Sequence, residues 1–300
     1  MTESLQSARL SLLAASQNQD GGWGYFPGTA SWVEPTAWAL AALRSAAGQG
    51  QRVRRALAWL RTMQRADGAC RPQAQVDEPS WMTALFVTAH LLEGVIDPPV
   101  QAAVRWLLAV KGAEGALWRR AVARALPRVE GYNPDRYGWA WVPNTNSWVE
   151  PTAHTLVALK LYRSRASTGR VDRETLNWRI QLGEQMLLDR RCRDGGWNYG
   201  ARQALGIPLP SYPETTGVAM MALQGASAVV SNGFLQAAGQ WCSQATSPLG
   251  RAWLSIGLRL HGATVAAPEA KPREDTLLVA LQALVENAPA LAALRLGNHS

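Results

Sequence analysis

The sequence predicts an all-α fold, an (α/α)6 barrel in which six helical hairpins form a toroid. Three observations lead to this prediction: a glycine turn motif recurs along the 300 residues, a helix-start motif occurs six times, and no stretch alternates between apolar and polar residues as a strand would. A supersecondary unit that recurs along a chain indicates a repeat architecture. Because no linking segment separates the repeats, we expect residues 1–300 to form a single domain.

The turn motif ends one helix of each hairpin and has the form Gln-x-x-x-Gly-x-Trp. Its clearest copy is "QNQDGGW" at 17–23, and the others are "QRADGAC" at 64–70, "KGAEGALW" at 111–118 and "RCRDGGW" at 191–197. Glycine permits the positive φ that stops a helix, and Asp-Gly favours a tight turn. We therefore expect a helix to end before each copy.

The second motif begins the next helix and is marked by an acidic residue. Its copies are "SWVEPTAWAL" with Glu34, "QVDEPSWMTAL" with Glu78, "SWVEPTAHTL" with Glu150, "SYPETTGVAM" with Glu214, and the looser "TSPLGRAWL" and "KPREDTLLVAL". The helices that follow are apolar nearly all round, as expected of inner helices with neighbours on every side. Amphipathic stretches between them, such as 51–64 and 172–190, predict outer helices. The sequence therefore predicts six inner and six outer helices.

Residues 119–146 interrupt this pattern between an outer and an inner helix. The segment is rich in arginine and ends in the turn-rich stretch "GYNPDRYGWAWVPN". Long insertions of this kind usually carry function. We expect it to lie over one mouth of the barrel.

Composition narrows the class of partner. The chain is 47% hydrophobic and 17% charged, enough to bury a large core, and its net charge is +8. Excess arginine suits anionic partners such as diphosphates or anionic lipid headgroups. We expect no nucleic-acid partner, because no nucleic-acid-binding module is visible and the arginines are scattered.

Cysteine usage and the N-terminus predict a cytoplasmic protein. Cys70, Cys192 and Cys242 are odd in number and far apart, which argues against a disulfide framework. The first residues lack the layout of a signal peptide, and no apolar run reaches the roughly 18 residues that span a bilayer. Peripheral membrane contact stays open.

The turn and helix-start motifs together resemble the QW repeats of the squalene and oxidosqualene cyclases, whose toroid is shared by the β subunits of protein prenyltransferases. The resemblance covers most of the chain and implies a terpenoid cyclase-like protein that binds a polyprenyl or triterpenoid substrate. We expect no cofactor and no metal site, because neither the zinc ligands of prenyltransferases nor an Asp-rich diphosphate–magnesium motif is visible.

The resemblance also implies catalytic positions. In the cyclases the middle Asp of an Asp-x-Asp-Asp-Thr-Ala motif protonates the substrate. The matching position falls on Glu34, Glu150 and Glu274, and Asp275 keeps the third acidic position of the last copy. No copy retains the full motif.

His154 marks a departure from the repeat, because it replaces the Trp38 of the first copy. It lies four residues after Glu150, so the two side chains share one face of a helix. We expect them to form an acid–base pair in which each shifts the pKa of the other. The alternative is architectural: Ser three residues before each Glu fits a capping box, and the histidine is a buried, hydrogen-bonded residue.

Fourteen Trp against three Phe indicate either packing wedges between helices or an aromatic-lined cavity. In the cyclases such rings stabilise carbocations through their π faces. The candidates for a lining are Trp32, Trp38, Trp81, Trp139, Trp141, Trp148, Tyr212 and Trp253. Arg119, Arg120 and Arg136 are expected to hold a diphosphate where the substrate carries one.

The leading functional prediction is therefore cyclisation or isomerisation of an apolar isoprenoid-type molecule by carboxylate and histidine acid–base chemistry. One alternative is a non-catalytic toroid that binds an isoprenoid or a protein, working with a partner subunit or as a homodimer. Another is a polysaccharide-active α/α barrel, which needs paired carboxylates across a cleft and aromatic platforms at its rim.

Overall fold

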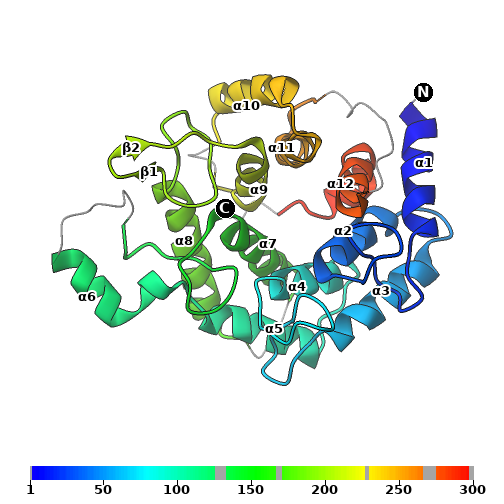
Figure 1. Cartoon of the computed structure of the whole chain (residues 1–300), viewed down its shortest axis with the longest axis horizontal. Helices are drawn as coiled ribbons and strands as arrows, with labels where there is room; N and C mark the ends of the chain where they lie inside the picture. The colour runs from blue at the N-terminus through cyan, green and yellow to red at the C-terminus, as the bar shows by residue number, and fades with distance from the viewer. Residues whose placement is uncertain (1, 126–132, 167–170, 227–229, 266–274, 297–300) are drawn as a thin grey trace.

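The computed structural model describes residues 2–125, 133–166, 171–226, 230–265 and 275–296, and in these ranges the chain is largely helical. Six of the described helices form a closed ring in the order α2 (Val33–Leu43), α4 (Thr83–Leu92), α7 (Val149–Arg165), α9 (Pro213–Ala222), α11 (Pro248–Leu260) and α12 (Thr276–Glu286). Helix α12 packs against α2 and so closes the ring (Figure 1). The predicted α/α toroid is confirmed.

Five described helices pack around this ring. They are α1 (Thr2–Ala15), α3 (Gly50–Thr62), α5 (Pro98–Ala109), α8 (Arg173–Asp189) and α10 (Asn232–Gln244). Each precedes an inner helix in the chain and buries one face against the ring. The sixth predicted outer helix falls between α11 and α12, where the described residues 261–265 are not helical and 266–274 lie outside the described ranges.

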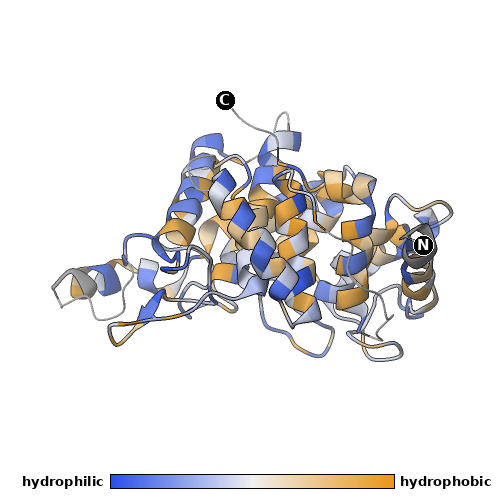
Figure 2. Cartoon of the chain, turned by 90° about the horizontal axis from the view of Figure 1, so that it is seen from above, coloured by the Kyte–Doolittle hydropathy of each residue, from blue (hydrophilic) through white to orange (hydrophobic). Residues whose placement is uncertain are grey.

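Smaller elements lie outside the two layers. They are η1 (Ala113–Gly115), α6 (Leu117–Ala125), α13 (Ala288–Ala292) and an antiparallel hairpin of β1 (Gln203–Ala204) and β2 (Ile207–Pro208). Helix α6 projects from the body on the same side as the hairpin in two perpendicular views (Figures 1 and 2). No described helix is long and apolar enough to cross a membrane.

The predicted turn motif fixes four of the inner helices by a recurring contact, which we call the Trp–Thr clasp. The main-chain N–H of the motif's last residue donates to a threonine hydroxyl in the first turn of the next inner helix. The pairs are Trp23–Thr36 (2.8 Å), Cys70–Thr83 (2.8 Å), Trp139–Thr152 (3.0 Å) and Trp197–Thr216 (3.0 Å). The turn glycines Gly21, Gly68 and Gly195 have φ of +100°, +92° and +98°, so the predicted positive φ is confirmed at these three copies. It is wrong at Gly115 of the fourth copy, which lies in the short helix η1.

The clasp tryptophans are buried in the barrel wall. The indole N–H donates at 2.7–2.8 Å to the last turns of the preceding outer helices, at the carbonyls of Leu13, Leu107 and Leu187. Trp139 is the clasp tryptophan of the third repeat, so Trp118 of the predicted "KGAEGALW" copy is not. The insertion therefore lies inside the turn motif of this repeat, and α6 belongs to it.

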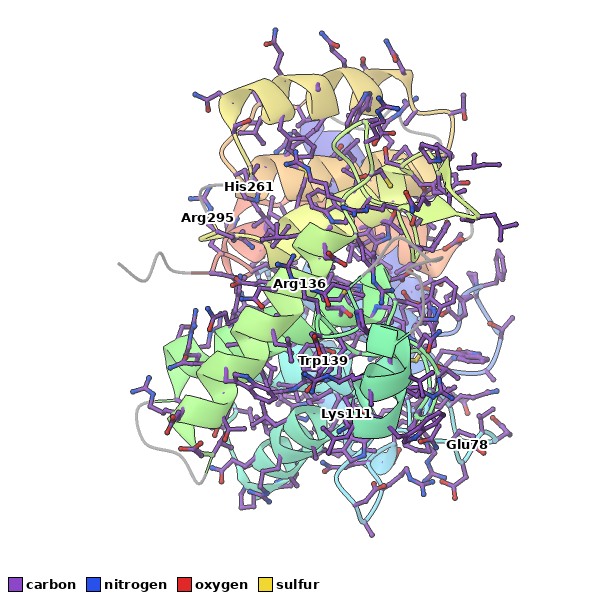
Figure 3. All side chains as sticks on the ribbon, turned by 90° about the vertical axis from the view of Figure 1, so that its left-hand side faces the viewer. Glu78, Lys111, Arg136, Trp139, His261 and Arg295 are labelled. Atoms are coloured by element: carbon purple, nitrogen blue, oxygen red, sulfur yellow. The ribbon has the colours of Figure 1, made fainter. Side chains whose placement is uncertain are left out.

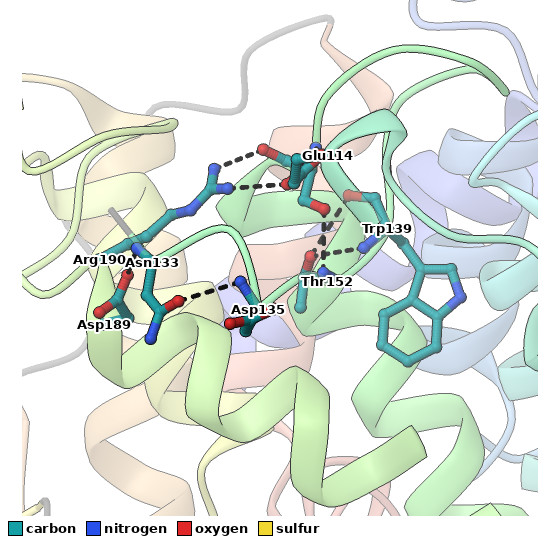
Figure 4. Close-up of polar contacts among 9 residues, drawn as sticks. Glu114, Asn133, Asp135, Trp139, Thr152, Asp189 and Arg190 are labelled. Atoms are coloured by element: carbon teal, nitrogen blue, oxygen red, sulfur yellow. Dashed lines mark hydrogen bonds and ion pairs between the residues drawn. The ribbon is translucent and has the colours of Figure 1, made fainter. Parts of the chain in front are cut away.

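A buried ion pair fixes the base of the insertion. Arg190 donates to Glu114 at 2.9 Å and to the carbonyl of Ser147 at 2.5 Å, and both side chains of the pair are about one-twentieth exposed or less (Figure 4). The Glu114 carboxylate also accepts from the Ser147 N–H at 3.0 Å. Separating the pair would leave a buried charge without a partner, which costs free energy. The contacts of Glu114 and Arg190 with Ser147 therefore hold the two ends of the insertion together.

A second contact joins each of four repeats to the one before it in the ring. The acceptor is the main-chain carbonyl of the residue two positions after the one whose N–H makes the clasp. The donor is a main-chain N–H at the start of the inner helix that comes before it in the ring. The four bonds are Thr276 to Tyr25 (2.8 Å), Val33 to Pro72 (2.9 Å), Trp81 to Trp141 (3.2 Å) and Val149 to Tyr199 (2.9 Å). The first of them joins α12 to the first repeat and so closes the ring.

The two mouths of the barrel differ. The first turns of the inner helices lie at one end with the turn-motif loops that bond to them, and we call this end the N-terminal mouth. The described C-terminal residues contact the other end. There Arg165 donates to the carbonyl of Ala293 at 2.8 Å and Gln224 to that of Leu294 at 3.1 Å. The C-terminal segment therefore packs over the ends of α7 and α9.

The clasp predicts a specific stability loss. In Thr152→Val the side-chain shape is kept but the buried N–H of Trp139 loses its acceptor, so we expect unfolding to become easier by about 1–3 kcal/mol. Urea denaturation followed by tryptophan fluorescence measures this.

Thr155→Val, in the same helix, is the matched control. Its hydroxyl donates to the carbonyl of Pro151 at 2.8 Å, so its removal leaves no main-chain N–H unpaired. We expect a loss of at most about 1 kcal/mol. Equal losses for the two variants would contradict the proposed role of the clasp.

Candidate functional site

Four carboxyl groups from different repeats gather at the N-terminal mouth. Glu34, Glu150 and Glu214 lie in the first turns of α2, α7 and α9, and Asp275 immediately precedes α12. The charge of Asp275 raises the pKa of Glu34, and the charges of Glu34 and Glu214 raise the pKa of Glu150. We call these four groups the acid ring.

The predicted capping boxes are wrong. The residues that precede the helices are Trp32, Trp148 and Tyr212, all extended, and none of them makes a side-chain cap. The hydroxyls of the serines before them bond to aspartates of the turn motifs instead. Ser31 donates to Asp20 at 2.9 Å and Ser211 donates to Asp194 at 3.0 Å. Main-chain bonds from the next repeat already satisfy the N–H of Val33 in α2 and of Val149 in α7, so Glu34 and Glu150 are not needed as caps.

Asp275 is the exception. Its carboxylate accepts from the Leu278 N–H at 3.0 Å and so caps α12. Its role is at least partly architectural. Glu274, the other acid predicted at this helix start, lies outside the described residues.

Glu34 is almost completely buried and accepts a short hydrogen bond from the Tyr25 hydroxyl. Burial and the neighbouring charge of Asp275 raise the pKa of Glu34 to about 7, against the opposing effect of the tyrosine hydrogen bond. Burial and the carboxylate beside it raise the pKa of Tyr25 as well, so the phenol keeps its proton. Tyr25 and Glu34 form a fixed donor–acceptor pair.

Glu150 accepts no hydrogen bond from a described residue. Loss of hydration raises its pKa to about 8, and the charges of Glu34 and Glu214 add to this effect. A carboxyl group that keeps its proton at neutral pH is a general acid, and one without a partner is free to give that proton to a ligand.

His154 does not form the predicted acid–base pair with Glu150. No hydrogen bond joins the two described side chains, and burial alone lowers the pKa of His154 to about 3. Its ring stacks on Trp81 at 5.1 Å and lies 5.8 Å from Trp38. The two residues share a helix face as predicted, but the histidine lies one turn deeper, where its ring contacts the rings of three tryptophans.

His154, Trp38, Trp81 and Trp253 together form what we call the aromatic floor below the acid ring. Trp253 lies 5.0 Å from Trp38 and 5.6 Å from His154, and all four side chains are buried. Neither the Nε2 of His154 nor the Nε1 of Trp38 has a hydrogen-bond partner in the described structure. Such unpaired polar atoms are rare inside proteins and indicate a place for a polar ligand atom or a water molecule.

Aromatic rings also surround the mouth, and some were not predicted. Trp141 contacts the edge of Trp81 at 5.3 Å, Trp32 lies 5.7 Å from Tyr25, and Tyr212 lies 5.4 Å from Tyr199. Trp148 is about one-third exposed there. The prediction missed Tyr25 and Tyr199, although a signal exists: an aromatic residue follows each clasp tryptophan two positions later, at Tyr25, Trp141 and Tyr199.

Other predicted binding residues lie elsewhere. Trp139 is in the barrel wall, where the guanidinium of Arg179 covers its ring at 4.0 Å. Arg120 pairs with Asp135 at 2.6 Å, and Arg136 with Asp189 at 3.5 Å on the outer side of the insertion (Figure 3). Arg119 lies on α6 beside Trp118. The structure therefore does not assemble the predicted diphosphate-binding arginines at the mouth.

A groove of about 440 Å³ opens beside Glu214. Acidic, hydroxyl and aromatic side chains line it, among them Asp194, Tyr212, Trp241 and Ser247. The Ser247 hydroxyl donates to Glu214 at 2.7 Å. Among the described residues, no group of three His, Cys, Asp or Glu side chains has the geometry to hold a metal ion.

Comparison with known proteins shows the fold. No protein-family model and no curated protein matches the sequence. The type II terpene cyclase MstE from Scytonema superposes with a TM-score of 0.57 at 16% identity, over 96% of this chain and 98% of that one.

Two glycoside hydrolases share the same fold. The family 8 endoglucanase Cel10 from Klebsiella pneumoniae matches with a TM-score of 0.53 at 14% identity, over 93% of this chain and 97% of that one. The GH63 mannosylglycerate hydrolase from Thermus thermophilus matches with 0.53 at 13% identity, over 93% and 99%. At such identities the likeness establishes a shared α/α toroid.

The raised pKa of Glu150 predicts a pH-dependent stability. Below the ordinary value of 4.5 both the folded and the unfolded chain hold the proton, and between 4.5 and about 8 only the folded chain does. Stability therefore falls as the pH rises through this window. Glu150→Gln carries no ionisable group, so its Tm relative to wild type should rise across the same window.

Thermal unfolding followed by circular dichroism at a series of pH values checks this. Glu78→Gln, at an exposed loop position, is the control and should follow the wild-type curve. A constant difference in Tm between Glu150→Gln and wild type at every pH would show that Glu150 titrates normally.

Proposed function

We propose that this protein is a terpenoid cyclase-like enzyme that protonates an apolar isoprenoid-type chain at the N-terminal mouth. The observation that carries the proposal is the position of the Glu150 carboxyl, which lies in the first turn above the aromatic floor and accepts no hydrogen bond from a described residue. Its raised pKa of about 8 favours the protonated form at neutral pH. The acid supplies a proton, and the floor supplies an apolar, π-rich surface for the chain.

The reaction begins with Glu150. Its O–H bond breaks as a C–H bond forms at the terminal alkene carbon, which leaves a tertiary carbocation and a glutamate anion. The π faces of the floor rings at Trp38, Trp81 and Trp253 stabilise the cation, which the next double bond of the chain attacks to close a ring. Loss of a proton from the final cation to the Glu150 carboxylate restores the acid, so the overall reaction is an isomerisation.

Glu34 and Tyr25 support this proton transfer. The hydrogen bond from Tyr25 holds Glu34 in a fixed position. The negative charge of the ionised Glu34 contributes to the raised pKa of Glu150. A glutamic acid is a weak donor to an isolated alkene, so a terminal epoxide, whose oxygen accepts the proton directly, is the easier substrate. Among the neighbours of similar fold, MstE was crystallised with geranylgeranyl dihydroxybenzoate, described as its substrate.

A second candidate is a polysaccharide-active barrel. The groove beside Glu214 favours it, because carboxylates and aromatic rings line an open surface there, and the two glycoside hydrolases share the fold. Glycoside hydrolysis needs two carboxyl groups on opposite sides of a sugar ring. The apolar floor below Glu150 fits an isoprenoid better than a sugar, so we place this candidate second.

The proposed acid predicts a pH profile. With a geranylgeranylated aromatic acid or its terminal epoxide as substrate, turnover should fall as the pH rises through about 8, because Glu150 loses its proton there. Glu150→Gln should reduce the rate by about a hundredfold or more. Mass spectrometry detects a product of changed retention time and unchanged mass from the polyene.

Glu78→Gln is the control and should retain wild-type turnover, and circular dichroism should show that each variant is folded. Full activity in folded Glu150→Gln would overturn the proposed acid. Release of reducing sugar from a soluble glucan by the wild-type protein, with no isoprenoid product, would favour the second candidate.

A further inference from the structure

The groove beside Glu214 adjoins the acid ring, because this carboxylate belongs to both. Glu214 lines the groove, and its charge contributes to the raised pKa of Glu150. The groove is formed by the first turn of α9, the end of α10 and the link from α10 to α11. Helix α11 packs against both α9 and α10 (Figure 1). The groove therefore opens directly beside the proposed acid.

The start of α11 holds the Glu214 carboxylate in place. Its Oε1 accepts a hydrogen bond from the Ser247 hydroxyl at 2.7 Å, and this hydroxyl accepts in turn from the N–H of Gly250 at 3.1 Å. Glu214 also packs closely on Gly250, where a Cβ would come within 2.7 Å of Oε1. No described residue donates a hydrogen bond to Oε2. One oxygen of Glu214 is therefore fixed and the other is open to a ligand.

A second carboxylate in the groove, Asp194, is fixed by its own loop. Its Oδ1 accepts from the N–H of Gly196 at 3.2 Å, and its Oδ2 accepts from the N–H and the hydroxyl of Ser211, both at 3.0 Å. Among the described lining residues none is Lys, Arg or His. Aromatic rings and uncharged polar groups complete the lining, at Tyr212, Trp241, Gln244, Thr246 and Ser247.

This combination of side chains recognises an uncharged ring that carries several hydroxyls. Fixed carboxylate oxygens accept hydrogen bonds from ligand hydroxyls, and hydrogen bonds to a charged acceptor are the stronger kind. The rings of Tyr212 and Trp241 offer apolar surface to the C–H groups of such a ring. Two carboxylates without a basic neighbour in the lining disfavour a phosphate or a carboxylate by repulsion.

A cationic ligand fits the groove less well than an uncharged one. The negative charge of Glu214 helps to raise the pKa of Glu150. A positive group beside Glu214 would offset this charge and favour loss of the Glu150 proton. An uncharged ring leaves the proposed acid in its protonated form.

We propose that the groove binds an uncharged polyhydroxylated ring of the pyranose type, and that this ring is the head group of the isoprenoid substrate. The ring donates hydrogen bonds to Glu214 and Asp194, and the attached chain runs past Glu150 to the aromatic floor. The role as a head group rests on the function proposed above, whereas binding of the ring itself does not.

The ring is held in the groove and is not cleaved there. Hydrolysis of a glycoside needs a carboxyl group that gives its proton to the glycosidic oxygen. Both oxygens of Asp194 accept hydrogen bonds within its loop, and Glu214 is bonded to Ser247. Both carboxylates therefore serve as fixed acceptors.

Three amphiphiles with the same octyl chain and different head groups test this proposal. They are octyl β-glucoside, octyl phosphate and octylamine, each added to the full chain below its micelle concentration and followed by saturation-transfer NMR. We expect the ring protons of octyl glucoside to contact the protein. We also expect octyl glucoside to bind about tenfold more tightly than either charged amphiphile.

Two variants locate the bound ring. Glu214→Gln should weaken binding of octyl glucoside by about tenfold, because a charged acceptor is lost. Tyr212→Leu should weaken it by about fivefold, because the aromatic surface is lost. Glu78→Gln and Trp178→Leu are the matched controls, since they change an exposed acid and an exposed ring away from the groove. Both controls should bind as the wild type does, and circular dichroism should show that every variant is folded.

Three results would overturn the proposal. One is octyl phosphate or octylamine that binds as tightly as octyl glucoside. Another is octyl glucoside binding that Glu214→Gln leaves unchanged. The third is release of glucose from the probe, which would make the groove the cleft of the polysaccharide-active candidate.

Binding in the groove and catalysis at Glu150 can fail separately. Glu150→Gln removes the proposed proton donor and leaves the groove intact, so it should bind octyl glucoside as the wild type does. Glu214-dependent binding without turnover of any isoprenoid would support the ring site while the proposed function falls. Turnover of an isoprenoid without binding of octyl glucoside would overturn the ring site and leave the proposed function standing.

Discussion

The main-chain bond between successive repeats is the constraint on which this structure depends. Every inner helix begins with N–H groups that have no partner within the helix. In four places the chain satisfies one of them with a carbonyl from the turn of the next repeat, and the bond from Thr276 to Tyr25 closes the circle. The Trp–Thr clasp then holds each turn against its own helix. Together these bonds place the first turns of the inner helices at one mouth.

That placement creates the acid ring. A carboxyl at a helix N-terminus normally favours ionisation, because the helix dipole stabilises the negative charge. Here loss of hydration and repulsion between neighbouring carboxylates outweigh the dipole, so the pKa values of Glu34 and Glu150 rise instead of falling. A single glutamate at a helix start would have an ordinary pKa. The pKa rises because the repeats bring several such carboxyl groups close together.

The sequence predicted the scaffold well because periodicity and turn chemistry are local. Six inner helices and the positive-φ turn glycines follow directly from the motifs. The capping boxes failed because the acceptors for the first-turn N–H groups come from another repeat, which no local pattern reveals. Trp139 was misassigned because the insertion separates it from the rest of its turn motif. The helix face predicted for His154 was right. Its neighbours depend on its depth along the barrel axis, which the sequence does not reveal, and at that depth they are aromatic rings and not a carboxyl group.

The proposed chemistry depends on a proton that Glu150 holds at neutral pH, beside a Glu34 that is partly ionised there. Carbon-13 NMR of the full chain labelled at the glutamate carboxyl carbon measures this directly, with Glu150→Gln and Glu34→Gln used to assign the two signals. The account predicts titration of Glu150 at about 8 and of Glu34 at about 7. Titration of both groups near the ordinary value of 4.5 would contradict it, since neither would then be an acid at neutral pH.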